Sequence, residues 1–185
     1  MENNLLKKIF SDSKKQKTFI SIYSNEEDTD VFSIGIICNF DDDFVLIKKV
    51  SPEGNFDGFS ILLIEDIYSI EYGDKYLKKM QLSIKEDIIN ISDDIQDLLL
   101  SNFRFDDLLK LCSKKRFLVS INSVYNRNFI GYIEDFDGEN VIINNVDEYN
   151  ENDGFSFFRI LEIERISLFE TELKTITNIK KVINQ

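Results

Sequence analysis

Apolar residues near the start of the chain recur at helical spacing and then change to alternation. From Leu5 to Phe10 they fall on one face with lysines between them, which predicts a short amphipathic helix over 4–15. Beyond this helix, apolar residues in the strand period are separated by polar turns. They predict five strands, at 18–23, 31–40, 44–50, 59–64 and 67–72. Only Glu65 and Asp66 separate the last two strands.

The second half of the chain shows the same order of patterns. A helix is predicted at 106–114, and five strands are predicted at 117–121, 128–136, 140–146, 155–160 and 163–169. The intervening stretch 85–102 is rich in Ile and Leu, and Ser92 to Asp94 offer an N-cap, so a helical connector is expected there. For 173–183 the pattern allows either a shorter helix or a final strand.

The two halves are also related in sequence. Residues 34–72 recur without a gap at 130–168, and 15 of these 39 positions are identical. A spacing of 96 residues in a chain of 185 indicates two folded units rather than the short stacked repeats of a solenoid. We expect a first unit at 1–83, a connector at 84–104 and a second unit at 105–185. The shared residues are mostly apolar residues, glycines and turn residues, which specify a fold and not a reaction.

Each repeat carries a Gly, an aliphatic residue two positions later, a Phe-Asp pair and an aliphatic strand. These motifs run from Gly35 to Ile47 and from Gly131 to Ile143. The pattern resembles the Sm and bacterial Hfq family of small SH3-like barrels, over about 55 residues of each half. The resemblance implies a mainly β protein, built from two tandem five-stranded SH3-like or Sm-like barrels with a short helix before each. It also suggests a bacterial source.

Charge narrows the range of functions. The formal net charge is −12, from 34 acidic and 22 basic side chains. An acidic surface repels phosphate backbones and anionic lipids, which disfavours a general nucleic-acid or membrane role. The basic residues cluster before each repeat, and those before the second include Lys114, Lys115 and Arg116. We interpret these clusters as solvated helix ends, where cations complement the helix dipole; a local basic patch is the alternative.

The resemblance also implies a way of binding RNA. Sm-like proteins use polar turn residues, a stacking group and a basic residue between strands four and five. The candidates here are Asn140 in a turn together with Lys114, Lys115 and Arg116, whereas Leu161 and Glu162 occupy the second position. Several aromatic residues could stack on bases, although alternating aromatics in a small barrel are more often buried or face a partner. These are Tyr68, Tyr72, Tyr76, Phe155, Phe157, Phe158 and Phe169.

The sequence offers little for catalysis or metal binding. It contains no His, which removes the usual general base and the commonest metal ligand. Asp41 to Asp43 and the oxygen-rich loop 147–154 could hold a cation, but turn chemistry is the favoured interpretation, because the loop does not fit EF-hand spacing. We therefore predict no catalytic residue, no metal site and no cofactor.

The two cysteines, Cys38 and Cys112, lie in apolar stretches at non-equivalent places of the two repeats. This disfavours a disulfide framework and suggests a reducing compartment. The N-terminus lacks the apolar core of a signal peptide, and no apolar run is long enough to span a bilayer. We predict a cytoplasmic protein.

These observations favour a non-enzymatic protein-interaction or assembly module, which binds a protein partner or associates with itself through sheet edges. One form of it is an immunity or inhibitor protein whose acidic face blocks a basic nuclease. The alternative is an RNA-binding regulator of the Sm or Hfq type. A third hypothesis is a sensor with a small ligand in a cleft between the barrels.

Overall fold

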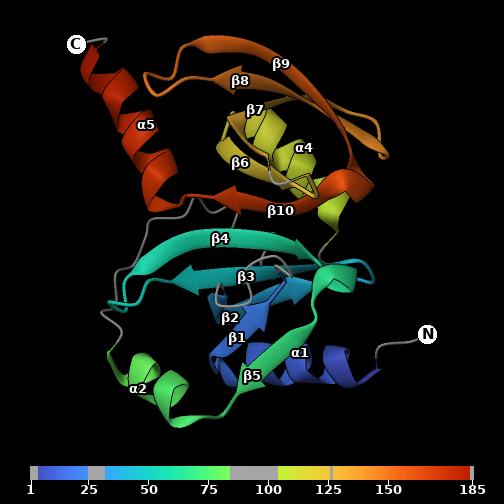
Figure 1. The fold of residues 1–185 in the computed structure, drawn as a ribbon, viewed down its shortest axis with the longest axis vertical. Helices are drawn as coiled ribbons and strands as arrows, with labels where there is room; N and C mark the ends of the chain where they lie inside the picture. The colour runs from blue at the N-terminus through green and yellow to red at the C-terminus, as the bar shows by residue number, and fades with distance from the viewer. Residues whose placement is uncertain (1–3, 25–31, 84–103, 126, 184–185) are drawn as a thin grey trace. The chain divides into compact units, whose positions relative to one another are not determined.

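The computed structural model describes residues 4–24, 32–83, 104–125 and 127–183 (Figure 1). It confirms the mainly β class: ten strands form one open antiparallel sheet, and the described residues include four α-helices. The strand order is β5-β1-β2-β3-β4-β10-β6-β7-β8-β9. Because this sheet has two ends, two closed barrels are not shown.

The chain divides into two compact units, and the division interrupts one strand. The first unit comprises Met1–Asp57 and Leu62–Phe103, and the second comprises Gly58–Ile61 and Arg104–Gln185. Four residues from the middle of a strand in the first repeat therefore belong to the second unit. The predicted connector at 84–104 lies outside the described residues except for Arg104.

The first unit begins with the predicted helix, and its strands follow in the predicted order. Its elements are α1 (Asn4–Gln16), β1 (Ile20–Tyr23), β2 (Ser33–Phe40), β3 (Phe44–Val50), the two ends of β4 (Phe56–Leu63), the 3-10 turn η1 (Ile64–Asp66), β5 (Ser69–Tyr72) and α2 (Lys75–Ser83). Gly35 allows β2 to approach β3 closely, because a Cβ there would collide with the carbonyl oxygen of Lys48.

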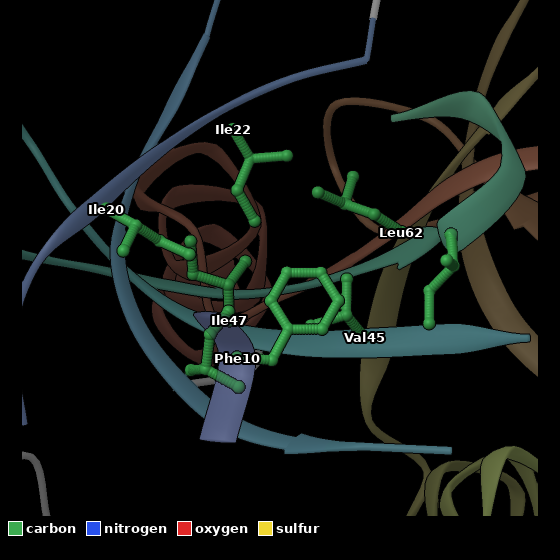
Figure 2. Packing of buried hydrophobic residues seen from close by; sticks show 8 residues of the cluster. Phe10, Ile20, Ile22, Val45, Ile47 and Leu62 are labelled. Atoms are coloured by element: carbon green, nitrogen blue, oxygen red, sulfur yellow. The ribbon is translucent and has the colours of Figure 1, made fainter. Parts of the chain in front are cut away.

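The core of the first unit is built around Phe10, the fully buried aromatic residue of α1. Figure 2 shows its ring between Ile47 and Val45, two residues that β3 directs to the same face. Ile20 and Ile22 of β1, which is separated from β3 by β2, complete the cluster. The helical spacing of the first apolar residues thus places one ring against a strand face of branched aliphatic side chains.

The second unit repeats this order of elements. It contains α4 (Phe105–Lys115), β6 (Leu118–Ser123), β7 (Asn128–Phe136), β8 (Asn140–Val146), β9 (Asn152–Arg159), the 3-10 turn η2 (Ile160–Glu162), β10 (Ile163–Leu168) and α5 (Thr171–Ile183). The strand registers agree as well: Gly35 pairs with Lys49, and Gly131, 96 positions later, pairs with Asn145. The structure resolves the open choice at the C-terminus, because 171–183 is helical.

The sequence patterns missed one helix, α2. Only Leu77 and Met80 anchor it, in a cluster with Phe19 and Ile34, so its periodicity is too short to stand out. It occupies the place in the first unit that α5 occupies in the second, where Leu173 and the following turn of helix cover Leu118. Both helices cover the face of a sheet that would otherwise be exposed.

Two strands begin earlier than the sequence suggested. β4 starts at Phe56 rather than at residue 59, and β9 starts at Asn152 rather than at residue 155. The residues at these starts include Asp-Gly, which normally indicates a turn. In β9 they are paired nonetheless, because Val146 of β8 lies opposite Asn152. Among the described residues, no helix is long and apolar enough to cross a membrane.

Replacing Phe10 by Ala should lower the free energy of unfolding by about 3–5 kcal/mol, the cost typical of deleting a buried ring. Leu5 lies on the same helix with 80% of its surface exposed, so Leu5→Ala should change stability by no more than about 0.5 kcal/mol. Urea denaturation followed by circular dichroism compares the two variants. Equal losses would contradict the packing of Phe10 in the core.

Candidate interaction surface

Strand β9 forms one end of the sheet, and its outer residues are unusually apolar. Within the described residues its single neighbour is β8. Phe155 and Phe157 are 63% and 62% exposed, although both are large aromatic residues. Phe158 points to the opposite face and is buried against Phe129, with ring centroids 4.8 Å apart. One face of β9 therefore belongs to the core, and the other carries two aromatic rings in solvent.

Strand β5 forms the other end of the sheet. Its neighbour is β1, with Ile22 opposite Ile70 and Ile20 opposite Tyr72. Ile70 and Tyr72 consequently lie on the face that contains the core residues of β1. Tyr72 remains 61% exposed, whereas Glu71 on the other face accepts a hydrogen bond of 3.0 Å from the hydroxyl of Tyr23.

A shallow concavity of about 620 Å³ lies beside this end strand. It is lined by Ile70, Glu71, Tyr72, Asp74, Lys75 and Tyr76. Tyr76 on α2 is 48% exposed, so two tyrosine rings border the concavity. The other walls carry charged side chains, those of Glu71, Asp74 and Lys75, so the concavity is amphipathic.

The residues of β4 that belong to the second unit have buried side chains, in contrast to the exposed rings of β9. Phe59 and Ile61 are each 1% exposed. The ring of Phe59 lies 6.5 Å from that of Phe169, which in turn contacts Phe117 edge to face at 5.1 Å. On the other face of the strand, the hydroxyls of Ser60 and Ser167 are 3.3 Å apart.

The residues predicted for RNA binding lie around α4 and the β7–β8 turn. The Arg116 guanidinium forms an ion pair of 2.9 Å with Glu134 and lies 4.8 Å from the centre of the Tyr132 ring. The amide of Asn140 donates to the Asp137 carboxylate at 3.0 Å. Lys114 and Lys115 end the helix with exposed side chains. The structure thus engages Arg116 and Asn140 in local contacts.

The aspartates considered as cation ligands act in turns. Asp41 accepts hydrogen bonds from the backbone N–H groups of Asp43 and Phe44 at 3.0 and 2.7 Å. Asp137 does the same for Glu139 and Asn140, and these bonds, led by that from the Asn140 side chain, lower its pKa. Asp147 likewise accepts from two N–H groups within its loop. In the part of the chain that is described, no three potential ligands of this kind meet.

Of the two cysteines, Cys112 is buried and Cys38 is half-buried. Burial raises the pKa of Cys112 to about 12 and that of Cys38 to about 11. Lys48 and Lys14 oppose the shift at Cys38 but do not cancel it. Because the thiolate is the reactive form, neither cysteine is poised as a nucleophile.

No protein-family model matches this chain, and no curated protein matches it either.

The sequence predicted that Phe155, Phe157, Tyr72 and Tyr76 stack on bases, face a partner or are buried. All four side chains are exposed, which leaves base stacking and a partner contact open. The sequence did not predict that Phe155 is exposed while Phe59, the equivalent residue of the first repeat, is buried. The identity of the two segments concealed the difference, since their sequences are alike and their neighbours are not.

The raised pKa values predict slow labelling of both cysteines by a thiol reagent at pH 8. With a pKa of about 11, Cys38 should hold about two orders of magnitude less thiolate than an unperturbed cysteine. Cys112 should react more slowly still, and both should react at the ordinary rate in 6 M guanidinium. Labelling of Cys38→Ser and Cys112→Ser variants separates the two sites. Fast labelling of Cys112 in the folded protein would contradict its burial.

The same shifts predict a loss of stability in alkali. A thiol in the unfolded chain ionises near its ordinary pKa of 9.0, whereas the folded ones resist ionisation up to about 11 and 12. The contribution of the two thiols to the free energy of unfolding is therefore complete below pH 9, and it is lost as the pH rises from 9 toward the pKa values of the folded protein. Urea midpoints should fall between pH 9 and 11 and fall less steeply in Cys38→Ser, whose stability at pH 7 provides the reference.

Proposed function

We propose that this chain is a non-enzymatic protein-interaction or assembly module that works through the open ends of its sheet. The observation that carries the proposal is the pair of exposed rings, Phe155 and Phe157, on the end strand β9. An end strand presents unpaired N–H and C=O groups along its free side. Those groups can bind an added strand, while the side chains between them select which strand is added.

The side chains on β9 fit an interaction surface better than a solvent-facing edge. Edge strands that avoid association commonly carry charges, Pro or a disruptive bulge. Phe155, Ser156 and Phe157 are uncharged, and the two rings on one face offer a large apolar area at low entropic cost. Large aromatic residues are also the ones that most often dominate binding energy in protein interfaces.

The polar groups considered for chemistry support a non-enzymatic role. Asp41 and Asp137 accept turn hydrogen bonds, and burial of the Cys112 thiol disfavours its ionisation. Each of these groups has a structural use that accounts for its place in the sequence. A hydrolytic activity abolished by replacing a single polar residue would overturn this part of the proposal.

We also propose that the two units are tandem variants of one SH3-like or Sm-like design. The shared order of a helix, five strands and a 3-10 turn between strands four and five supports this proposal, as does the common spacing of 96 residues. An experimental structure in which the first and fifth strands of a unit lie apart would contradict it.

The proposal predicts that charges on β9 abolish association. In the double variant Phe155→Glu, Phe157→Glu, two carboxylates replace the rings, so any complex formed through this edge should weaken by about 100-fold or more. Tyr125, 70% exposed in the β6–β7 turn, provides the matched control Tyr125→Glu. The measurements are light scattering of the purified proteins and quantitative co-purification from cells of the source organism.

The control should retain whatever complex the original chain forms. If the double variant also retains every complex, β9 is not the binding edge and the proposal is wrong. The RNA alternative is tested in parallel with short U-rich and A-rich RNA. Micromolar binding with a steep salt dependence, lost in Arg116→Glu, would favour an RNA-binding regulator.

A further inference from the structure

The duplication makes the two ends of the sheet counterparts of strands that pair within the chain. Each residue of β4 (Phe56–Leu63) lies 96 positions before a residue of β9 (Asn152–Arg159). In the same way, β5 (Ser69–Tyr72) corresponds to the last four residues of β10 (Ile163–Leu168). β4 and β10 are neighbours in the sheet, whereas β9 and β5 end it. The described residues thus contain one contact of this type and the two separate halves of another.

Residues of β4 and β10 are buried, whereas the equivalent residues of the end strands β9 and β5 are exposed. This difference is expected if β9 and β5 lack the contact that β4 and β10 make. Phe59 is 1% exposed, and its counterpart Phe155 is 63% exposed. Leu168 on β10 is 2% exposed, and its counterpart Tyr72 on β5 is 61% exposed. Ile61 and Phe157 show the same contrast. An apolar residue has been kept at each position, although among the strands that the structure describes only one copy has an intramolecular neighbour that buries it.

The backbone at the start of these strands supports the same equivalence. Gly58 and Gly154 both adopt positive φ, at 83° and 87°. A Cβ at Gly58 would collide with the carbonyl oxygen of Leu168 and lie 2.7 Å from the backbone nitrogen of Glu170. Nothing lies within 4 Å of the same position at Gly154. The second glycine retains the conformation that a close backbone approach requires, but the approaching backbone is absent.

From these observations we infer that β9 of one copy pairs antiparallel with β5 of a second copy of this chain. The inference rests on the proposed function and names its partner. It transfers to the open ends the arrangement of β4 and β10, in which the hydroxyls of Ser60 and Ser167 lie 3.3 Å apart. Ser156 of one copy then faces Glu71 of the other.

The polar pair in this register is chemically complementary. Ser156 Oγ accepts a hydrogen bond from the Asn145 amide at 2.8 Å, which leaves its own proton to donate. Glu71 accepts one bond from Tyr23 and has further lone pairs for a second donor. A serine hydroxyl and a carboxylate form a stronger bond than the two hydroxyls of the internal pair.

The apolar faces also correspond. Phe59 and Ile61 lie on the face of β4 opposite to Ser60, so their counterparts Phe155 and Phe157 lie on the face opposite to Ser156. On β5 the face opposite to Glu71 carries Ile70 and Tyr72, which line the concavity of about 620 Å³. The register therefore directs the two exposed rings toward the side of β5 that carries Ile70 and Tyr72.

Because the contact joins two different surfaces, each copy that uses β9 still offers β5. Such a heterologous contact continues beyond a dimer until a ring closes or a filament grows. This separates it from a symmetric dimer, in which two copies of β9 would pair with each other. Two single-edge variants distinguish these arrangements.

In the experiment, Phe155→Glu disables β9 and Tyr72→Glu disables β5, each at a residue more than half exposed, so that folding is preserved. Sedimentation velocity of the full chain should show oligomers for the original protein and for Tyr125→Glu. Each single-edge variant alone should be monomeric, with association at least about 100-fold weaker. Their equimolar mixture should form a dimer containing one copy of each, because one intact β9 then meets one intact β5. Circular dichroism checks that both variants are folded.

Cysteine pairs test the register. Under mild oxidation, Ser156→Cys mixed with Glu71→Cys should form a disulfide-linked dimer, since directly opposed residues meet the distance requirement. Tyr125→Cys mixed with Glu71→Cys should not. Crosslinking of Ser156→Cys with itself, or oligomers that survive in Tyr72→Glu, would overturn the inference in favour of a symmetric contact.

The outcomes also separate this inference from the proposed function. An original chain that stays monomeric up to millimolar concentration overturns the inference. If Phe155→Glu nevertheless loses a different protein partner, the proposed function stands. If no complex of any kind depends on β9, both are wrong.

Discussion

Strand β4 approaches β10 so closely at Gly58 that no side chain fits between their backbones. Glycine at positive φ permits this approach, and the residues after it, Phe59 and Ile61, are buried as a result. The compact units follow from the same contact, because residues 58–61 group with the second unit although they belong to the first repeat. One backbone constraint therefore determines where four residues of β4 are packed and which side chains they bury.

The contact between β4 and β10 also explains why side chains at the ends of the sheet are exposed. β9 carries the Gly-Phe-Ser segment of β4, but within the described residues no strand lies on its free side. Its rings are exposed for that reason and not because their chemistry differs. A large exposed aromatic residue normally incurs a solvation cost, so its retention on an end strand favours a role in binding. Both the proposed module and its pairing with a second copy derive from this contrast.

Groups that can suggest chemistry in the sequence have structural uses in the fold. The aspartates of the hairpin turns bind backbone N–H groups, and Arg116 ends its helix in the left-handed conformation while pairing with Glu134. Cys112 is buried and Cys38 is half-buried, and the loss of solvent favours the neutral form of both thiols. These uses agree with the proposed interaction module.

The elements with local patterns could be predicted from the amino-acid sequence. Alternation defined β3, β7 and β8 to the residue, and helical spacing defined α1, because these patterns reflect which side of each element is buried. It did not predict α2, with its two anchors, or the early starts of β4 and β9, where long-range pairing overrides an Asp-Gly turn signal. Nor could it distinguish Phe59 from Phe155, since both stand in the same Asp-Gly-Phe-Ser segment. The burial of one ring and the exposure of the other depend on which strand lies alongside, and for Phe59 that strand is more than a hundred residues away in sequence. Long-range packing of this kind leaves no local pattern from which it could be predicted.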